Sequence, residues 1–184
     1  MPTIRSLTTL LALSALAACG DDDNLPDPTE ANVVDTVTIG SLTDTPITTA
    51  SGFSVTLGAV RTDLTAAFDF AYDIQGPPET GVSVILPLAS LGLTPTGAEP
   101  GVMRRDEAFD DIEAAPSNGY VTDEAVPVAL GERYIVRSRI TCNIGVPLYA
   151  KVEVIGLEDN SLVLKVLANN NCGYRGLEPG FPDR

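Results

Sequence analysis

Residues 148–168, LYAKVEVIGLEDNSLVLKVLA, decide the fold class of this 184-residue chain. Two runs in this stretch, 148–155 and 162–168, are rich in Val, Leu and Ile, which favour extended strands. The segment between them, 156–161, contains Gly, Asp, Asn and Ser, which readily adopt the backbone conformations of turns. The stretch therefore predicts an antiparallel hairpin near the C-terminus.

Short apolar runs separated by Gly, Pro, Asn and Asp continue this pattern from about residue 32 onward. In the run 66–74 larger apolar residues alternate with acidic or small ones, which predicts a strand with two different faces. The apolar face consists of Phe68, Phe70, Tyr72 and Ile74, and the other face of Asp69, Ala71 and Asp73. Further strands are predicted over 33–39, 53–60, 82–86 and 132–140.

The segment RRDEAFDDIEA at 104–114 is the one helix candidate, because Ala108, Phe109 and Ile112 have helical spacing. Pro100 before it and Pro116 after it limit a helix to about three turns, and an extended conformation also fits. The patterns together predict an all-β protein, with a single antiparallel β-sandwich or barrel-like domain and at most one short helix.

The first residues have the pattern of an export leader. Residues 1–18 contain one charge, Arg5, followed by an apolar run too short to span a bilayer. The box LAAC at 16–19 resembles the lipobox of bacterial lipoproteins. The resemblance implies cleavage before Cys19, lipidation of Cys19 and anchoring of the mature chain to a membrane.

Residues 19–31 comprise the cysteine that would be lipidated and an acidic, Pro-containing segment, whose composition predicts a flexible tether. Residues 32–184 form the predicted β-rich domain. In Gram-negative lipoproteins an Asp directly after the lipidated Cys favours the inner membrane. Gly20 occupies that position, so the resemblance favours the outer membrane of a bacterial cell envelope.

Lipidation of Cys19 leaves Cys142 and Cys172. Exported chains meet an oxidising compartment, and these two cysteines would lie just beyond the open end of the predicted hairpin. We therefore expect one structural disulfide between them, which attaches a C-terminal tail rich in turn formers. In that tail Tyr174, Arg175 and Phe181 form either a recognition patch or a flap packed on the sheet.

Amino-acid composition and net charge argue against several classes of function. The chain has no His and a net charge of −14, which argues against His-dependent catalysis, His-ligated metals and nucleic-acid binding. Residues 19–124 carry 19 acidic and 3 basic side chains, whereas 125–184 carry 6 and 7. The acidic part is expected to repel anionic membrane surfaces and keep the domain upright on its tether.

Few residues remain as candidates for chemistry. Lys151 and Lys165 are predicted to be exposed strand residues. In strand 132–140, Tyr134, Val136 and Ile140 share one face and Arg133, Arg137 and Arg139 the other. Hard oxygen ligands for a divalent cation cluster at Asp106, Asp110, Asp111 and Glu113, but their spacing does not match a calcium loop and favours a solvated acidic loop.

Parts of the domain resemble the HmuY-type haem-binding lipoproteins. The similar segments are AAFDFAYDI at 66–74, FDDIEAAPSNGY at 109–120, GERYIVRSRI at 131–140 and VPLYAKVEV at 146–154. The resemblance implies an all-β lipoprotein that captures a ligand, with haem held by axial His or, in some members, Met. This chain has no His, and Met103 is its only Met after the leader, so such two-ligand capture within one chain is excluded and no cofactor is expected.

The sequence thus favours an exported, lipid-anchored envelope protein with a non-catalytic binding or structural role, such as an accessory or interaction module. Its expected partners are the membrane, through the anchor, and another envelope protein. Two alternatives stay open: HmuY-like capture of a small ligand without His ligation, and a hydrolase that uses two facing carboxylates of different pKa.

Overall fold

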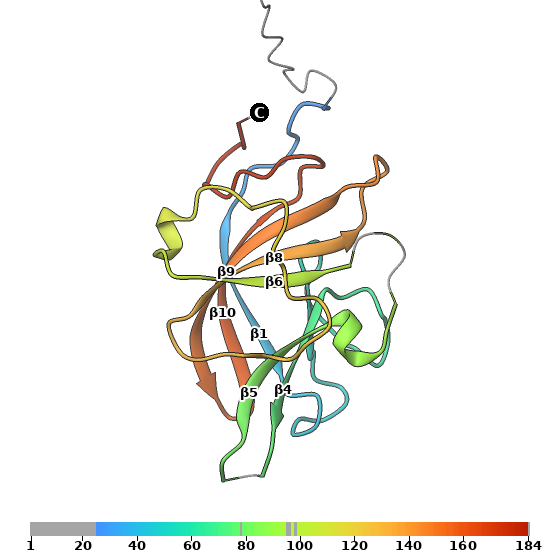
Figure 1. Cartoon of the computed structure of the whole chain (residues 1–184), viewed down its shortest axis with the longest axis vertical. Coiled ribbons are helices and arrows are strands. Elements are labelled where there is room, and N and C mark those ends of the chain that lie inside the picture. Colours follow the sequence, from blue (N-terminus) through green and yellow to red (C-terminus); the bar gives the residue numbers. More distant parts are fainter. Residues whose placement is uncertain (1–24, 78, 95–96, 98, 184) are drawn as a thin grey trace, which may run out of the picture.

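Two five-stranded antiparallel sheets pack face to face in the computed structural model, which describes residues 25–77, 79–94, 97 and 99–183 (Figure 1). The first sheet has the strand order β1-β10-β9-β8-β6, and the second has the order β3-β2-β4-β5-β7. This arrangement confirms the predicted all-β sandwich. The leader, Cys19 and the first part of the predicted tether lie outside the described residues.

The first sheet contains the hairpin on which the fold prediction was based. Its strands are β1 (Val34–Gly40), β6 (Gly101–Arg105), β8 (Arg133–Ile140), β9 (Pro147–Glu158) and β10 (Ser161–Asn169). The turn is shorter than the predicted segment 156–161, because only Asp159 and Asn160 lie between β9 and β10. Both have positive φ, 48° and 60°, as a two-residue turn compatible with strand twist requires.

The second sheet is built from shorter strands: β2 (Gly52–Ser54), β3 (Gly58–Val60), β4 (Phe70–Gln75), β5 (Val82–Pro87) and β7 (Val126–Pro127). The prediction of one strand over 53–60 was wrong, because the chain reverses between Ser54 and Gly58 and β2 pairs with β3. Gly58 has a φ of 70°, which a residue without a side chain adopts without strain.

The helix predicted over 104–114 is absent. Residues up to Arg105 belong to β6, and only Phe109–Asp111 form a short 3₁₀ turn, with a second 3₁₀ turn at Leu88–Leu91. Phe109 and Ile112 have helical spacing in the sequence, but both are buried against the first sheet by a segment without regular helix.

The main core lies between the two sheets. Phe53 and Phe70 from the second sheet stack with ring centroids 5.0 Å apart. They pack in one cluster with Tyr134 of β8 and with aliphatic side chains of β9 and β10. As predicted, Phe70 and Tyr72 face this core. The prediction that Phe68 shares their face was wrong, because β4 begins only at Phe70, and Phe68 packs with Ala71 in a smaller, separate cluster.

Both ends of the described chain lie at one end of the sandwich, and the tip of the β4–β5 hairpin lies at the opposite end (Figure 1). Asn32 pairs with Gly180 through two backbone hydrogen bonds, 2.7 and 3.0 Å long. Within the part of the chain that the structure describes, no helix is long and apolar enough to cross a membrane.

Strand β1 leaves the longest unpaired edge among the described strands. The N–H groups of Thr36 and Gly40 point away from β10, because they donate to Asp35 Oδ1 (2.7 Å) and to Ala50 O (2.8 Å). Alternation along an antiparallel strand therefore directs the backbone groups of Val34, Thr36 and Thr38 outward. The Asp35 carboxylate occupies the central N–H of this edge and adds a charge, two features that discourage pairing with another strand.

We expect Asp35→Ala to increase self-association, since it frees the Thr36 N–H and removes the charge from the edge. The association constant measured by sedimentation equilibrium should rise roughly tenfold, equivalent to about 1.4 kcal/mol. Asp123→Ala removes the same charge from an exposed loop and serves as the control. Equal association constants for the two variants would contradict the protective role of Asp35.

Candidate functional site

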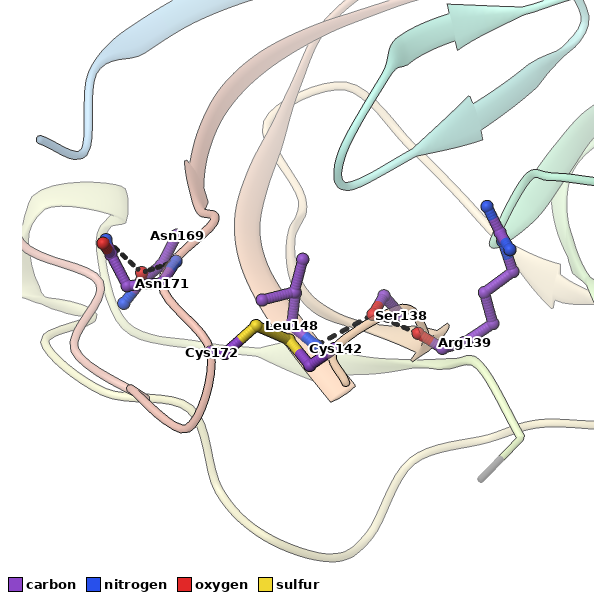
Figure 2. The surroundings of a disulfide bond; sticks show 7 residues. All are labelled: Ser138, Arg139, Cys142, Leu148, Asn169, Asn171 and Cys172. Atoms are coloured by element: carbon purple, nitrogen blue, oxygen red, sulfur yellow. Dashed lines mark hydrogen bonds between the residues drawn. A yellow bond between two sulfur atoms is a disulfide. The ribbon is translucent and has the colours of Figure 1, made fainter. Parts of the chain in front are cut away.

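The predicted disulfide is present between Cys142 and Cys172, with their Cα atoms 5.8 Å apart (Figure 2). Cys142 lies in the connection between β8 and β9, and Cys172 follows the end of β10. Ser138 reinforces the same connection, because its Oγ accepts from the Leu148 N–H (2.8 Å) and donates to Arg139 O (2.6 Å). The bond thus attaches the C-terminal tail to the end of the sheet.

Next to this disulfide, the tail binds the segment that enters the domain from the N-terminal side. Asn171 is buried, and its Oδ1 accepts from the N–H groups of Thr29 (2.8 Å) and Glu30 (3.1 Å). Its Nδ2 donates to Glu30 O (2.8 Å) and to Asn169 Oδ1 (3.0 Å). One amide side chain therefore satisfies three backbone groups of the entering segment.

Two further contacts hold this segment. The Tyr174 hydroxyl donates to Pro26 O (3.0 Å), and Asn32 Nδ2 donates to Glu178 O (2.9 Å). We name the set Asn32, Asn171 and Tyr174 the entry clamp. It places residues 25–31, predicted as part of the flexible tether, against the tail. Of the two arrangements considered for the tail, a recognition patch or a packed flap, Tyr174 adopts the packed flap, because its side chain is buried. Phe181, in contrast, is exposed.

Removing the disulfide should weaken the whole protein. A cross-link that closes a loop with a sequence separation of 30 lowers the entropy of the unfolded chain. This effect contributes about 3.5 kcal/mol. We expect the double variant Cys142→Ser/Cys172→Ser to lose that amount from its free energy of unfolding in urea. Reduced wild-type protein should behave alike, and a loss below about 1 kcal/mol would show that the bond is energetically minor.

The outer face of the first sheet, which faces away from the second sheet, is also covered. Phe109, Ile112 and Ala115 pack on Ile135 of β8 and Leu167 of β10, and Leu177 of the tail joins the same cluster. The covering residues 106–121 therefore form a layer that sequence periodicity did not predict as such. The run of apolar residues at helical spacing was its only signal.

This cover overturns the prediction for one lysine. Lys151, expected to be exposed, is only 1% exposed, and burial lowers its pKa. Its Nζ donates to Ile112 O (3.0 Å) and lies 4.7 Å from the centroid of the Phe109 ring. Lys165 Nζ lies 4.0 Å from the same centroid and 3.4 Å from Asp110 Oδ1, at the partly exposed margin of the cover. The Phe109 ring thus contacts both ammonium groups.

Basic side chains are concentrated on this outer face. Residues directly opposite each other in antiparallel strands share a face of the sheet. The pairing of β6 with β8 places Arg105 beside Arg133, and the pairing of β8 with β9 places Arg137 beside Tyr149. Arg133 and Arg137 of β8 are half-buried beside the covering layer. Arg139, predicted on the same face, lies instead after an irregularity in the β8–β9 pairing, and its charge acts on Asp69, the residue before β4 in the second sheet. Arg133 donates to Asp106 O (3.1 Å), a residue of that layer.

On this face Arg137 contacts an aromatic pair, and the charge of Arg175 from the tail acts on one of its two rings, Tyr120. The Arg137 Cζ lies 4.7 Å from the centroid of the Tyr120 ring, and Tyr120 lies 6.3 Å from Tyr149, centroid to centroid. The Tyr120 hydroxyl donates to Pro116 O (2.8 Å), and Arg175 Nε donates to the preceding carbonyl, Ala115 O (2.6 Å). Arg137, Tyr120 and Arg175, which we name the basic–aromatic cluster, are thereby brought together from three distant segments.

The hydrolase alternative requires two facing carboxylates, and two buried ones, Asp69 and Asp73, lie directly before β4 and within it. Burial raises the pKa of Asp69 to about 6, although its two oxygens accept from the N–H groups of Val55 (2.7 Å) and Arg139 (2.8 Å). For Asp73 burial also acts to raise the pKa, but hydrogen bonds from Ser41 and Thr43 outweigh it and lower the value. Each carboxylate binds backbone or hydroxyl groups of neighbouring segments, so both serve to hold loops in place.

Titration of Asp69 should make stability depend on pH. The pKa of Asp69 has an ordinary value of 3.8, which applies to the unfolded chain, and is about 6 in the folded protein. At pH values between these two, the folded protein therefore binds more protons than the unfolded chain. The contribution of Asp69 to the free energy of unfolding must therefore fall as pH rises through that window, by on the order of 3 kcal/mol. Urea unfolding across the window should show this fall.

Asp69→Asn cannot titrate and should lack that component of the pH dependence. Asp73→Asn is the matched control: the lowered pKa of Asp73 contributes stability that is lost as pH falls, so this variant should keep the Asp69 component. An unchanged pH profile in Asp69→Asn would contradict the assignment.

The four predicted metal candidates lie along the covering layer. Asp110 pairs with Lys165, while Asp106, Asp111 and Glu113 are exposed. In residues 25–183, apart from the few positions that are not described, no three or more His, Cys, Asp or Glu side chains form a group that could hold a metal ion. Met103, relevant to the haem resemblance, is half-buried on β6, and its Sδ lies 3.8 Å from Arg105 Nη1.

Comparisons with known proteins add no relative to this description. No family model matches the chain, and neither the curated proteins nor the solved structures contain a match. The class is therefore defined by the structure alone: a disulfide-linked β-sandwich whose C-terminal tail binds the segment entering the domain.

Proposed function

We propose that the protein is a lipid-anchored, non-catalytic binding or accessory module of a bacterial cell envelope, held at the outer membrane through Cys19. The observation that carries this proposal is the entry clamp. It fixes the N-terminal segment to one end of the sandwich: Asn171 Oδ1 accepts hydrogen bonds from the Thr29 and Glu30 N–H groups, and the Tyr174 hydroxyl donates to Pro26 O. A segment that only connected a leader to the domain would need no such attachment.

The clamp limits how far the domain can lie from the anchor. Only residues 20–24 separate Cys19 from Leu25, where the described chain begins. Fully extended, this connection spans at most roughly 22 Å. The clamped end of the sandwich would then lie near the membrane, and the β4–β5 hairpin, at the opposite end, would point away from it (Figure 1). Such a fixed orientation suits a module that presents a surface to another envelope protein.

A binding role is preferred to hydrolysis because of how the carboxylates are used. Asp69 and Asp73 have pKa values displaced in opposite directions, as a catalytic pair requires. Both are buried, however, and their oxygens accept hydrogen bonds from loops and strand ends. Ionised or not, they are occupied by structural contacts.

The anchoring half of the proposal is tested with Cys19→Ala, expressed in a bacterium with a lipoprotein-processing system. We expect this variant to lose incorporation of labelled fatty acid and to leave the membrane fraction, since the thiol is the acceptor of the lipid. Gly20→Ala, which leaves the box LAAC intact, should remain labelled and membrane-bound. Persistent labelling and membrane attachment of Cys19→Ala would refute lipid anchoring.

The partner half is tested by chemical crosslinking followed by purification under denaturing conditions. A lipid-anchored interaction module should yield one dominant crosslinked envelope protein. The same partner should be retained by wild-type protein and lost by the unanchored Cys19→Ala form if membrane placement matters. Absence of any specific crosslink across several linker lengths would count against an accessory role.

A further inference from the structure

We infer that the basic–aromatic cluster, Arg137, Tyr120 and Arg175, is a binding site for a doubly charged oxyanion such as a phosphate group. This inference goes beyond the proposed function, since it does not depend on lipidation of Cys19. Three observations support it: the two arginines form no ion pair with a carboxylate, their guanidinium groups are held in fixed positions, and some of their N–H donors have no acceptor.

The first observation is the uneven pairing of basic side chains. Over the described part of this acidic chain, the arginines Arg61, Arg104, Arg105 and Arg133 and the lysine Lys165 each lie within 4.0 Å of a carboxylate. Among the described residues, Arg137, Arg139, Lys151 and Arg175 form no such ion pair, although the sequence has more than twice as many acidic as basic residues. The buried Lys151 donates to Ile112 O, and the charge of Arg139 acts on the carboxylate of Asp69. Arg137 and Arg175, whose charges both act on Tyr120, are thus two cations without a carboxylate partner among the described residues.

The second observation is that both guanidinium groups are held by main-chain carbonyls. Arg137 donates from Nε (3.1 Å) and Nη2 (2.7 Å) to Glu99 O, and Arg175 donates from Nε to Ala115 O (2.6 Å). The Tyr120 ring supports Arg137 from one side. Such fixing lowers the entropy that a long side chain loses when it binds a ligand, so the site is organised in advance.

The third observation is that some guanidinium N–H donors of Arg137 and Arg175 have no acceptor among the described residues. No described residue accepts a hydrogen bond from Nη1 of Arg137 or from either Nη of Arg175. Arg175 is exposed and Arg137 half-buried, so these N–H groups are accessible at the margin of the covering layer. Guanidinium donors match the oxygens of phosphate in geometry and charge, and charge-assisted hydrogen bonds of this kind are the strong ones.

Tyr120 links the two arginines and keeps the site positive. Its hydroxyl and Arg175 Nε bind the consecutive carbonyls of Pro116 and Ala115, while its ring lies against Arg137. Burial raises the pKa of Tyr120, and the charges of Arg137, Arg175 and Arg105 oppose that rise. The phenol therefore stays neutral at physiological pH, and the guanidinium groups lie within electrostatic reach of it.

The test is a titration of the mature chain with inorganic phosphate, followed by calorimetry and by NMR of the arginine Nε–H groups. We expect saturable binding that shifts the Arg137 and Arg175 signals. Arg137→Gln and Arg175→Gln should each weaken binding at least tenfold, whereas Arg61→Gln, which removes an equal charge from a paired arginine elsewhere, should not. Thermal unfolding of all variants verifies that they are folded.

Phosphate could be free or part of a lipid headgroup, and a second arm separates these sources. Vesicles of phosphatidylcholine with and without phosphatidylglycerol are tested for binding to the non-lipidated Cys19→Ala chain. Binding of phosphate alone supports a soluble ligand, and binding of the anionic vesicles that Arg137→Gln abolishes supports a headgroup. No saturable binding of either probe, or equal weakening by Arg61→Gln, would overturn the inference.

Discussion

The Cys142–Cys172 disulfide is the constraint on which the rest of the structure depends. It attaches the tail to the end of the first sheet, and the attached tail then supplies Asn171 and Tyr174 to the entering segment and Leu177 to the cover of the outer face. One covalent bond therefore holds in place the tail residues of both the entry clamp and the cover of the outer face; Figure 2 shows Asn171 of the clamp close to this bond. Chain segments that are far apart in sequence meet because the tail cannot leave.

The cover on the outer face explains the unusual chemistry of this surface. A sheet that is solvated on one side would expose Lys151, Arg133 and Arg137, whereas here they lie beneath or beside residues 106–121. Their charges are compensated by carbonyl dipoles and aromatic rings as well as by carboxylates. Positive charge is thus retained on one face of an acidic protein, which is the physical basis of the oxyanion site.

Most strands could be predicted because local patterns determine them, although the run 53–60 contains a chain reversal that its pattern did not reveal. The disulfide could be predicted because the hairpin places Cys142 and Cys172 just beyond its open end. The turn residues between 156 and 161 and the alternation in 66–74 report directly on hairpin and strand. Burial of Lys151 and Asp69 could not be predicted, since it depends on segments that cover them from elsewhere in the chain. The cluster of Arg137, Tyr120 and Arg175 could not be predicted either, because only the folded tail and cover bring these residues together. The conformation of residues 104–114 was not predictable, because apolar residues at helical spacing fit a non-helical layer equally well.

The disulfide-held tail fixes residues 26–30, the segment through which we propose that the domain is anchored. Hydrogen exchange of the Thr29 and Glu30 amides, both bound to Asn171 Oδ1, measures this directly. In the oxidised protein these amides should be strongly protected, and selective reduction of Cys142–Cys172 should remove that protection while the amides of β8 and β9 keep theirs. Free exchange of Thr29 and Glu30 in the oxidised protein would contradict the account.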